Sequence, residues 1–398
     1  MKNEEIIENY PKYMMNTYTR QPIAISHGKG VKVWDNDGNE YIDLFAGIAV
    51  NNLGHAHPNI LKTLREQGEK VVHCSNIYYN ENQLKLAKLL NELIPNTKVF
   101  FANSGAEANE GAIKLARKYT KKTEIISAKN SFHGRTLATV TATGQPKYSE
   151  PFKPLPSGFK HVTFGDIDEL KNTVNDKTAA IILEVVQGEG GIITSDESYF
   201  KEVEKICKEN KTLLILDEVQ TGFGRCGKMF ASELYNLKPD VTTVAKGIGG
   251  GFPMGAIIAN EKVAEGFQPG DHGTTFGGTP LACAVAIASI NTILDENLIE
   301  NSENLGKYFK KELLKLKDKY CFIKDIRGYG LMIGVELDIT CFNIVDKARK
   351  KGFLINCTAK NVIRLTPPLI VKKEEIDIFI KTIDEIFLEI SDQSIEGD

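Results

Sequence analysis

The sequence predicts an α/β fold, with a mostly parallel central sheet in a large domain and a smaller α+β domain after it. From about Pro58 onward, short β-branched or aliphatic runs alternate with segments whose apolar residues recur every three or four positions. This alternation is typical of a parallel sheet covered by helices on both faces, and several runs are apolar throughout, as doubly buried strands are. The C-terminal part instead combines long charged helices with short strands.

The individual elements follow from these patterns. Strands of the large domain are expected at residues 123–127, 161–164, 179–186, 212–216, 241–245 and 256–259, and helices at 106–119 and 199–209. Nearer the start, Gly30–Trp34 and Glu40–Leu44 predict a hairpin across Asp37-Gly38. In the last third, helices at 297–317 and 374–390 flank strands around 331–336 and 362–365. We therefore expect an N-terminal segment (1–57) that packs with the small domain, a large domain (58–286) and a small C-terminal domain (287–398).

Composition excludes several classes of protein. The 398 residues suggest two or three domains at roughly 150 residues each, and 42% hydrophobic with 25% charged residues is typical of a globular chain. A net charge of −3 offers no basic excess for nucleic acid or an anionic membrane, and no apolar stretch is long enough to span a bilayer. The seven cysteines are scattered and form no C-x-x-C pair, which argues against a disulfide framework or structural zinc. Because the N-terminus is acidic and lacks the apolar core of a signal peptide, we expect a cytoplasmic protein.

The first chemical motif is Asn103–Glu107, which opens the helix expected at 106–119. Ser104 and Glu107 have the spacing of a capping box. The free backbone N–H groups of such a helix start can bind a phosphate, and Gly105 allows close approach. The alternative is an ordinary helix cap, because capping boxes are common.

The second motif is Leu213–Gln220, an apolar strand that ends in Asp217. Ligands of open α/β sheets bind at the carboxyl ends of strands, and an acid there can hold a cationic ring nitrogen such as that of pyridoxal phosphate. The alternative is a magnesium-binding aspartate beside a nucleotide. That aspartate normally accompanies G-x-x-x-x-G-K-[ST], which this sequence does not contain.

The third motif is Lys246 with the glycine-rich run 247–255. Lys246 follows the strand expected at 241–245, so its amine should reach the same sheet edge as Asp217. A lysine shielded from water has a depressed pKa and can form a Schiff base. A surface lysine before a loop is the alternative, whereas a nicotinamide dinucleotide is disfavoured because the glycine spacing does not fit G-x-G-x-x-G. Together the three motifs indicate a phosphate-bearing aromatic cofactor held by a lysine.

Two arginines and an aromatic ring complete a candidate substrate site. Phe132, just beyond the strand at 123–127, could stack on a planar cofactor, and Arg135 could hold a carboxylate through two hydrogen bonds. Arg364 lies within an otherwise apolar strand and needs an anion from the protein or a ligand. Structural salt bridges are the alternative for both arginines. His55 does not indicate a metal, since no further ligand pattern accompanies it.

These motifs, with others along nearly the whole chain, resemble the class III, fold-type I pyridoxal-phosphate aminotransferases. The additional matching segments are residues 13–18, 47–55, 75–79, 184–191 and 272–278. The resemblance implies that Lys246 binds the cofactor covalently and carries the proton, and that Asp217 pairs with the ring nitrogen. It also implies that Phe132 and Val219 cover the two faces of the ring, and that the segment of Glu218 and Gln220 binds the cofactor, with Gln220 at its phenolic oxygen. Ser104, Gly105 and Ala106 would bind the phosphate. Thr275 would contact the phosphate of the neighbouring subunit, which implies a homodimer.

The resemblance further implies the substrates. Arg135 and Arg364 would hold carboxylates and Thr274 would line the pocket. Glu189 would pair with Arg364 while the amino donor is bound and release it for 2-oxoglutarate. The implied reaction moves the terminal amino group of N-acetylornithine to 2-oxoglutarate in arginine biosynthesis, giving N-acetylglutamate 5-semialdehyde and glutamate. Ile48 favours an acylated donor, because ornithine aminotransferases tend to carry tyrosine at the matching place.

Alternatives remain open at this point. Ornithine, succinylornithine, succinyl-diaminopimelate and 4-aminobutyrate are other donors that the same cofactor machinery serves. A nicotinamide-dependent oxidoreductase and a non-catalytic, cofactor-binding relative are other classes of protein.

Overall fold

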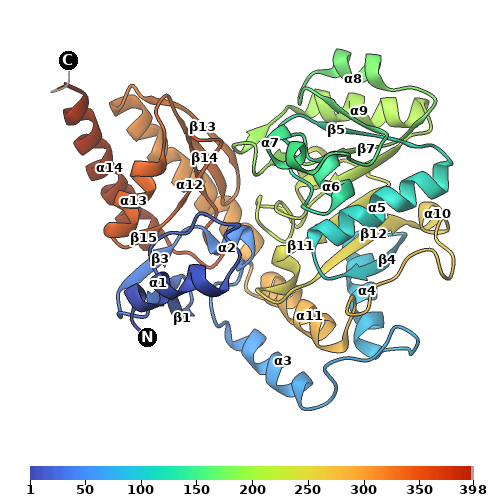
Figure 1. Cartoon of the computed structure of the whole chain (residues 1–398), viewed down its shortest axis with the longest axis horizontal. Coiled ribbons are helices and arrows are strands. Elements are labelled where there is room, and N and C mark those ends of the chain that lie inside the picture. Colours follow the sequence, from blue (N-terminus) through green and yellow to red (C-terminus); the bar gives the residue numbers. More distant parts are fainter. Residues whose placement is uncertain (396–398) are drawn as a thin grey trace.

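The computed structural model describes residues 1–395 and shows a seven-stranded sheet within the larger part of the molecule (Figure 1). In order across the sheet, the strands are β4 (Thr97–Ala102), β12 (Gly255–Asn260), β11 (Val241–Ala245), β10 (Leu213–Asp217), β7 (Thr178–Leu183), β5 (Glu124–Ala128) and β6 (Phe159–Val162). Neighbouring strands run parallel except around β12, which is antiparallel to both β4 and β11. The predicted α/β fold with a mostly parallel sheet is therefore confirmed.

Strand β4 is the member of this sheet that the sequence analysis missed. Its first two residues, Thr97 and Lys98, are only partly buried or exposed, and full burial begins at Phe101. Its apolar run, Val99–Ala102, is only four residues long and follows the polar residues Thr97 and Lys98.

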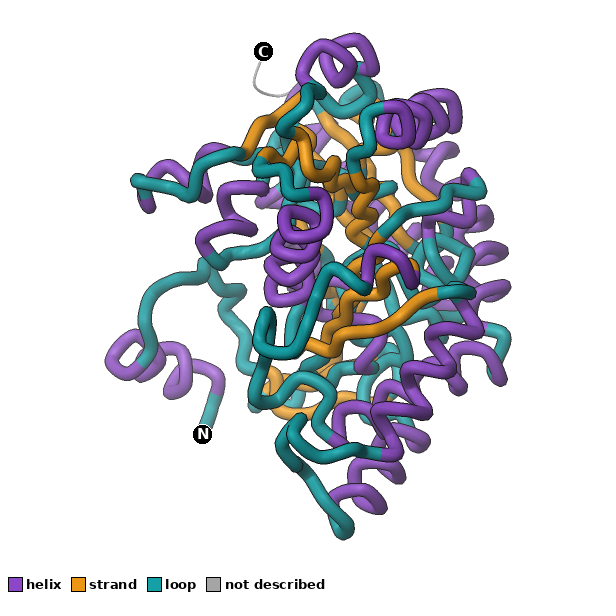
Figure 2. Tube along the Cα trace, turned by 90° about the vertical axis from the view of Figure 1, so that its right-hand side faces the viewer, coloured by secondary structure: helices purple, strands orange, loops and turns teal. Residues whose placement is uncertain are grey.

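Helices cover both faces of the sheet, because successive side chains of a strand point to opposite faces. In β10, Leu213 and Ile215 pack in one apolar cluster with α5 (Gly105–Thr120). Leu214 and Leu216 pack in a second cluster with α9 (Glu197–Glu209). Figure 2 shows the strands in the interior with helices around them. Burial on both faces explains why β10 is apolar at every position before Asp217.

The smaller part of the molecule contains two four-stranded sheets. One is antiparallel, in the order β13 (Ile323–Tyr329), β14 (Met332–Leu337), β17 (Val362–Leu365) and β16 (Asn356–Thr358). The other has the order β1 (Ile25–Lys29), β2 (Lys32–Asp35), β3 (Glu40–Asp43) and β15 (Phe353–Leu354). β2 and β3 form the hairpin expected across Asp37-Gly38, and β15 pairs in parallel with β3, so the N-terminal segment lies beside the C-terminal region (Figure 1).

The long helices of this smaller part are α12 (Leu298–Lys319), α13 (Phe342–Lys350) and α14 (Lys373–Ile395). The remaining elements are α1 (Asn3–Tyr13), α2 (Ala46–Ala49), α3 (Pro58–Gly68), α4 (Glu81–Leu93), α6 (Leu137–Ala142), α7 (Pro146–Ser149), η1 (Glu150–Phe152), α8 (Ile167–Thr173), β8 (Val186–Gln187), β9 (Ile193–Thr194), η2 (Ala231–Tyr235), η3 (Lys246–Gly249), α10 (Glu261–Ala264) and α11 (Pro280–Asp295). Within residues 1–395, no single helix is long and apolar enough to cross a membrane; α11 and α12 meet that criterion only as a pair bent by 60°.

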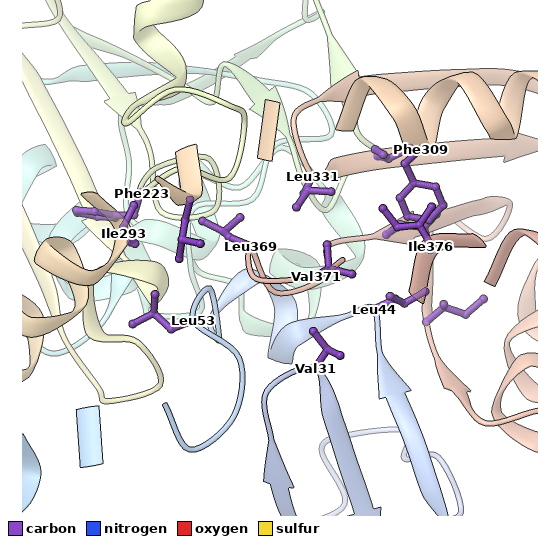
Figure 3. Close-up of a cluster of buried hydrophobic side chains, with 14 of the residues drawn as sticks. Val31, Leu44, Leu53, Phe223, Ile293, Phe309, Leu331, Leu369, Val371 and Ile376 are labelled. Carbon is purple, nitrogen blue, oxygen red and sulfur yellow. The ribbon is translucent and has the colours of Figure 1, made fainter. Parts of the chain in front are cut away.

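One apolar core joins the three regions of the chain (Figure 3). Val31 and Leu44 come from the N-terminal segment, Phe223 from the large sheet region and Leu369 from the C-terminal region. Helix α11 runs unbroken through position 286, so the expected boundary there falls inside a helix. The boundaries at 57 and 286 stay predictions.

The cysteine pairing differs from what the sequence suggested. Cys341, directly before α13, is bonded to Cys357 in β16, whereas the other five cysteines are free. The two partners are 16 residues apart, and it is the packing of α13 against β16 that brings them together. The sequence argued against a framework of disulfides and did not predict this single bridge.

Candidate active site

The residues expected to carry chemistry meet at the carboxyl ends of β10 and β11, around a cavity of about 420 Å³. Its walls contain nine of them: Ser104, Gly105, Ala106, Phe132, Arg135, Asp217, Val219, Gln220 and Lys246. The parallel register of β10 and β11 sets Asp217 opposite Thr243, three residues before Lys246, so the acid and the amine reach one space. A larger hollow of about 840 Å³, among residues 6–25 and 36, has no lysine or carboxylate in its lining and offers no such pair.

Asp217 is buried at the inner end of this cavity and is held by three hydrogen-bonding groups. Its Oδ2 accepts a hydrogen bond from Asn109 Nδ2 and lies 2.8 Å from His133 Nδ1, and its Oδ1 accepts from the backbone N–H of Val219 at 3.0 Å. Thr243 Oγ1 donates to Asn109 Oδ1 at 2.7 Å, which fixes the orientation of that amide. These three contacts hold the carboxyl group in one orientation. The cavity therefore has a rigidly held acid at one end.

Lys246 lies at the end of β11, where its backbone adopts a left-handed conformation with φ of 50°. That conformation is unfavourable for a residue with a side chain, and such strain concentrates at functional sites. Burial is the main reason that the pKa of the Lys246 amine falls from 10.5 to about 8; the Glu189 carboxylate opposes this fall and the Arg364 guanidinium adds to it. An amine with this pKa is partly unprotonated near neutral pH, as a nucleophile and proton carrier must be.

The start of α5 forms an anion site at the cavity. Ser104 Oγ accepts from the backbone N–H of Glu107 at 3.2 Å, and Glu107 Oε2 accepts from the backbone N–H of Asn103 at 2.9 Å. The capping residues are thus as expected, although the returning bond of Glu107 reaches Asn103 rather than Ser104. A Cβ on Gly105 would lie 2.8 Å from Val219, so no side chain fits there. The unpaired N–H groups and positive dipole end of this 16-residue helix favour a phosphate.

The remaining walls fit a planar ring. Phe132 and Val219 supply apolar surface, and Gln220 supplies an amide. Two buried polar atoms of the cavity residues, His133 Nε2 and Gln220 Oε1, have no hydrogen-bond partner within the described part of the chain. Buried polar atoms are normally paired, so this site is suited to a polar ligand. An acid, apolar walls, an amide, a lysine and a phosphate-binding helix start together fit pyridoxal phosphate.

Arg364, in β17, is a buried cation beside the cavity. Its side chain is 2% exposed, and its Nη1 lies 2.6 Å from Glu189 Oε1, which also accepts from Gln220 Nε2 at 3.2 Å. Burial alone would raise the pKa of Glu189, but the Arg364 and Lys246 cations lower it below its ordinary value. Glu189 is therefore an anion that masks Arg364, and Gln220 links this ion pair to the cavity wall.

Arg135 lines the cavity, whereas the expected Thr274 and Thr275 are not among its walls. Arg135 is exposed, and its guanidinium carbon lies 3.9 Å from the centre of the Tyr148 ring. Thr274 Oγ1 accepts from Asn103 Nδ2 at 3.1 Å, which places it next to the start of α5. Thr275 follows it and is exposed. The exposed Arg135 is therefore available to a ligand in the cavity.

Glu218 differs from the other expected cofactor residues because its carboxylate is turned away from the cavity. Its oxygens accept hydrogen bonds from the backbone N–H groups of Ala231 at 3.0 Å and Ser232 at 2.7 Å. These bonds stabilise the start of η2. In this structure Glu218 therefore supports the loop after β10 and does not line the site.

Glu184 is the main cavity residue to which the sequence analysis assigned no role. It is buried, and its two oxygens accept from the backbone N–H groups of Phe132 at 3.0 Å and Gly188 at 3.1 Å. Burial raises its pKa to about 7, although the nearby His133 opposes that rise. Its sequence signal resembles that of Asp217, since both acids stand at the carboxyl end of an apolar strand.

Asn109 and His133 were also given no role, although both hold Asp217. The sequence contained a weak signal for each: Asn109 interrupts the apolar face of α5, and His133 directly follows the expected stacking residue Phe132. Only the fold shows that both reach the same carboxylate.

Sequence comparison relates the whole chain to known aminotransferases. The family model described as aminotransferase class-III matches residues 13–387. A protein named acetylornithine aminotransferase from Methanothermobacter thermautotrophicus is 59% identical over 390 residues, covering 98% of this chain and 100% of that protein. One of the same name from Caldanaerobacter subterraneus subsp. tengcongensis is 53% identical over 386 residues, covering 95% and 98%.

Solved structures show the same fold. The acetylornithine aminotransferase of Elizabethkingia anophelis is 33% identical with a TM-score of 0.88, covering 98% of this chain and 100% of that one. The ornithine aminotransferase of Toxoplasma gondii is 32% identical with a TM-score of 0.96, covering 99% and 96%. With the cavity described above and a family match over most of its length, the chain belongs to the class III aminotransferase family.

Proposed function

We propose that this class III aminotransferase moves the terminal amino group of N-acetylornithine to 2-oxoglutarate in arginine biosynthesis. The observation that carries the proposal is the presence of Lys246 and Asp217 in one cavity, beside an arginine that an internal carboxylate masks. The choice of donor is supported by the relatives at 59% and 53% identity, both named acetylornithine aminotransferase.

Pyridoxal phosphate, the cofactor of this family, supplies a ring that stabilises negative charge on the carbon next to the reacting nitrogen. Three groups of this chain are suited to hold it. Lys246 offers an amine for covalent attachment, Asp217 offers an anion for the ring nitrogen, and the start of α5 offers backbone N–H groups for the phosphate.

Lys246 is also suited to move the proton. With a pKa of about 8, its amine can both accept and release a proton near neutral pH. A positioned general acid or base contributes about 10²–10⁴-fold to a rate. Its place on the wall of the cavity brings the amine to the bound substrate, and the alternation between two substrates predicts ping-pong kinetics.

The two arginines explain how one site accepts two unlike substrates. N-acetylornithine has one carboxylate and a neutral acyl group, and the exposed Arg135 can bind that carboxylate. 2-Oxoglutarate has two carboxylates and needs a second cation. While Glu189 stays on Arg364, the site offers one unpaired arginine, Arg135; when Glu189 moves aside, it offers two. Half-buried Ile48, two residues before the cavity residue Val50, is compatible with an acylated donor.

We also propose that the enzyme is a homodimer in which Thr275 contacts the phosphate site of the neighbouring subunit. Support comes from strongly exposed apolar side chains on two loops, namely Ile77, Tyr78, Tyr79 and Phe276. Asn76 Nδ2 donates to the carbonyl oxygens of Thr274 and Gly277, so the two loops form one surface next to the start of α5. Exposed apolar surfaces of this kind are typical of subunit interfaces. Light scattering on the wild type and on Tyr79→Asp tests this: a monomeric wild type would contradict the proposal.

A cytoplasmic location is part of the same proposal. Five of the seven cysteines are unpaired, as is common in a reducing compartment, although Cys341 and Cys357 are bridged. Fractionation of the native cells with an antibody against the chain tests the location directly.

The decisive experiment compares kcat/KM for N-acetylornithine, ornithine and 4-aminobutyrate, each with 2-oxoglutarate. We expect N-acetylornithine to be used far more efficiently. Ornithine is the main competitor, because the fold matches an ornithine aminotransferase with a TM-score of 0.96. Equal values, or a preference for free ornithine, would refute the assigned donor, and an enzyme that uses none of the three would refute the reaction.

A further inference from the structure

The hairpin formed by β16 and β17 holds both members of the Glu189–Arg364 pair. Asn356 in β16 lies directly opposite Arg364 in the antiparallel register. Asn356 and Thr358 point to the same side of β16, because side chains two residues apart share a face, whereas Cys357 between them points away to its partner Cys341. Thr358 Oγ1 donates to the backbone carbonyl oxygen of Glu189 at 2.8 Å.

Asn356 occupies one edge of the Arg364 guanidinium. Its Oδ1 accepts hydrogen bonds from Arg364 Nε at 3.2 Å and from Nη2 at 2.8 Å. The opposite atom, Nη1, donates to Glu189 Oε1 at 2.6 Å and to the Gly188 carbonyl oxygen at 3.3 Å. A guanidinium has five N–H donors in a fixed plane. With the Nε edge occupied, the Nη1–Nη2 edge is the one from which Glu189 can be displaced by an incoming carboxylate.

We propose that Asn356 is a positioning residue for the amino acceptor: it fixes the plane of Arg364 and presents the Nη1–Nη2 edge to a carboxylate of 2-oxoglutarate. This inference rests on the proposed function, since it assigns Asn356 to the acceptor step of that reaction. Arg364 is buried, so its orientation depends on such contacts rather than on water.

The neutrality of Asn356 is the chemical reason for an amide at this position. An aspartate of the same shape would accept the same two hydrogen bonds, but it would also neutralise Arg364 permanently. The arginine would then attract a substrate carboxylate weakly, whether or not Glu189 had moved. An amide orients the cation and leaves its charge for the acceptor.

Thr358 completes the arrangement by holding the main chain of Glu189. Because its bond is to the carbonyl oxygen, the Glu189 side chain can leave Arg364 while its backbone stays in place. One strand thus holds the cation by its guanidinium edge and the masking acid by its backbone.

The test uses the cofactor-loaded enzyme and two variants, Asn356→Asp and Asn356→Ala. Single-turnover measurements follow the colour change of the bound cofactor with N-acetylornithine alone and then with 2-oxoglutarate alone. Calorimetry measures the binding of glutarate, which has the two carboxylates of 2-oxoglutarate and no reactive carbonyl. Asn361→Asp is the matched control: it makes the same chemical change in the same hairpin, where the Asn361 side chain bonds the Leu337 carbonyl oxygen instead of an arginine.

For Asn356→Asp we expect the KM for 2-oxoglutarate and the Kd for glutarate to rise by about ten- to a hundredfold, the range spanned by the loss of one charge-assisted hydrogen bond. The donor step should stay close to the wild type, because Arg364 is masked in that step in any case. Asn356→Ala should show the same bias toward the acceptor, and its melting temperature reports any folding defect separately. Asn361→Asp should leave the ratio of the two KM values unchanged.

Either of two results would overturn the inference: glutarate binding unchanged in Asn356→Asp, or donor and acceptor steps weakened equally. A wild-type enzyme that does not convert N-acetylornithine would instead refute the proposed function. The glutarate measurement would still decide the role of Asn356 in that case, because it requires no turnover.

Discussion

Replacing Lys246 with methionine should stabilise the cofactor-free protein at neutral pH. Burial lowers the pKa of this amine from 10.5 to about 8, so the folded state disfavours the ammonium form. At about 1.36 kcal/mol per pH unit, the whole difference is worth up to about 3 kcal/mol. Methionine has a similar length and no charge, so the folded variant does not carry the free-energy cost of burying an ammonium group.

The pH dependence distinguishes this electrostatic effect from a change in packing. Between pH 8 and 10.5 the unfolded wild type binds more protons at this group than the folded one, so wild-type stability rises with pH in that window. The advantage of Lys246→Met should therefore be about 3 kcal/mol at about pH 7 and about 1.5 kcal/mol at about pH 9.5.

Urea unfolding of the cofactor-free proteins at these two pH values measures the effect. Lys262→Met, a matched change of an exposed lysine in α10, is the control and should alter stability little at either pH. A Lys246→Met variant that is less stable than the wild type, or whose advantage does not change with pH, would refute the reasoning. Lys246→Met should also fail to retain the cofactor covalently after borohydride treatment.

Three further changes test other parts of the site and fold. Gly105→Ala places a Cβ 2.8 Å from Val219, so it should weaken cofactor binding and lower the free energy of unfolding by about 1–3 kcal/mol. Cofactor titration measures the affinity and urea unfolding measures the stability. An unchanged affinity for the cofactor would argue against a phosphate site at Gly105. Asp217→Asn removes the acid at the end of the cavity and should lower kcat by about 10²–10³-fold. It should also lower the melting temperature, because one side of the asparagine amide turns a donor toward the donors that Asp217 accepts from. Activity near the wild-type level would contradict its role. Reduction of the Cys341–Cys357 bridge by a dithiol should lower the free energy of unfolding by about 3 kcal/mol, as expected for a loop of this length, and a double serine variant should not respond to the dithiol.

Local patterns in the sequence were sufficient for all strands of the large sheet except β4. Strand β11 and strand β17 begin and end at the residues expected, because each is a short run rich in β-branched residues with clear ends. β4 was missed; its apolar run is short and follows the exposed Lys98. The parallel arrangement was also predictable, since strands that alternate with helices leave few other topologies.

The candidate site was predictable where a motif carries its own chemistry. Residue type and position at the end of a strand or the start of a helix were enough to predict roles for Asp217, Lys246 and the Ser104 segment. Arg364 was recognisable because a cation in an apolar strand requires an anion. Its partner Glu189 was reached through the family resemblance and is bonded to it in the structure.

What the sequence alone determined, then, is what depends on neighbours along the chain: the strands and helices, the cap of α5, and the residue types that a cofactor site requires. Only the tertiary structure decided which distant residues share a contact: that Asn109 and His133 hold Asp217, that Glu218 turns away, that Asn356 holds Arg364, and that Cys341 meets Cys357. The physical reason is that these contacts depend on the direction of each side chain from its element and on the packing of elements far apart in sequence. Such contacts form through the burial of a common core, which no local pattern of residues encodes by itself.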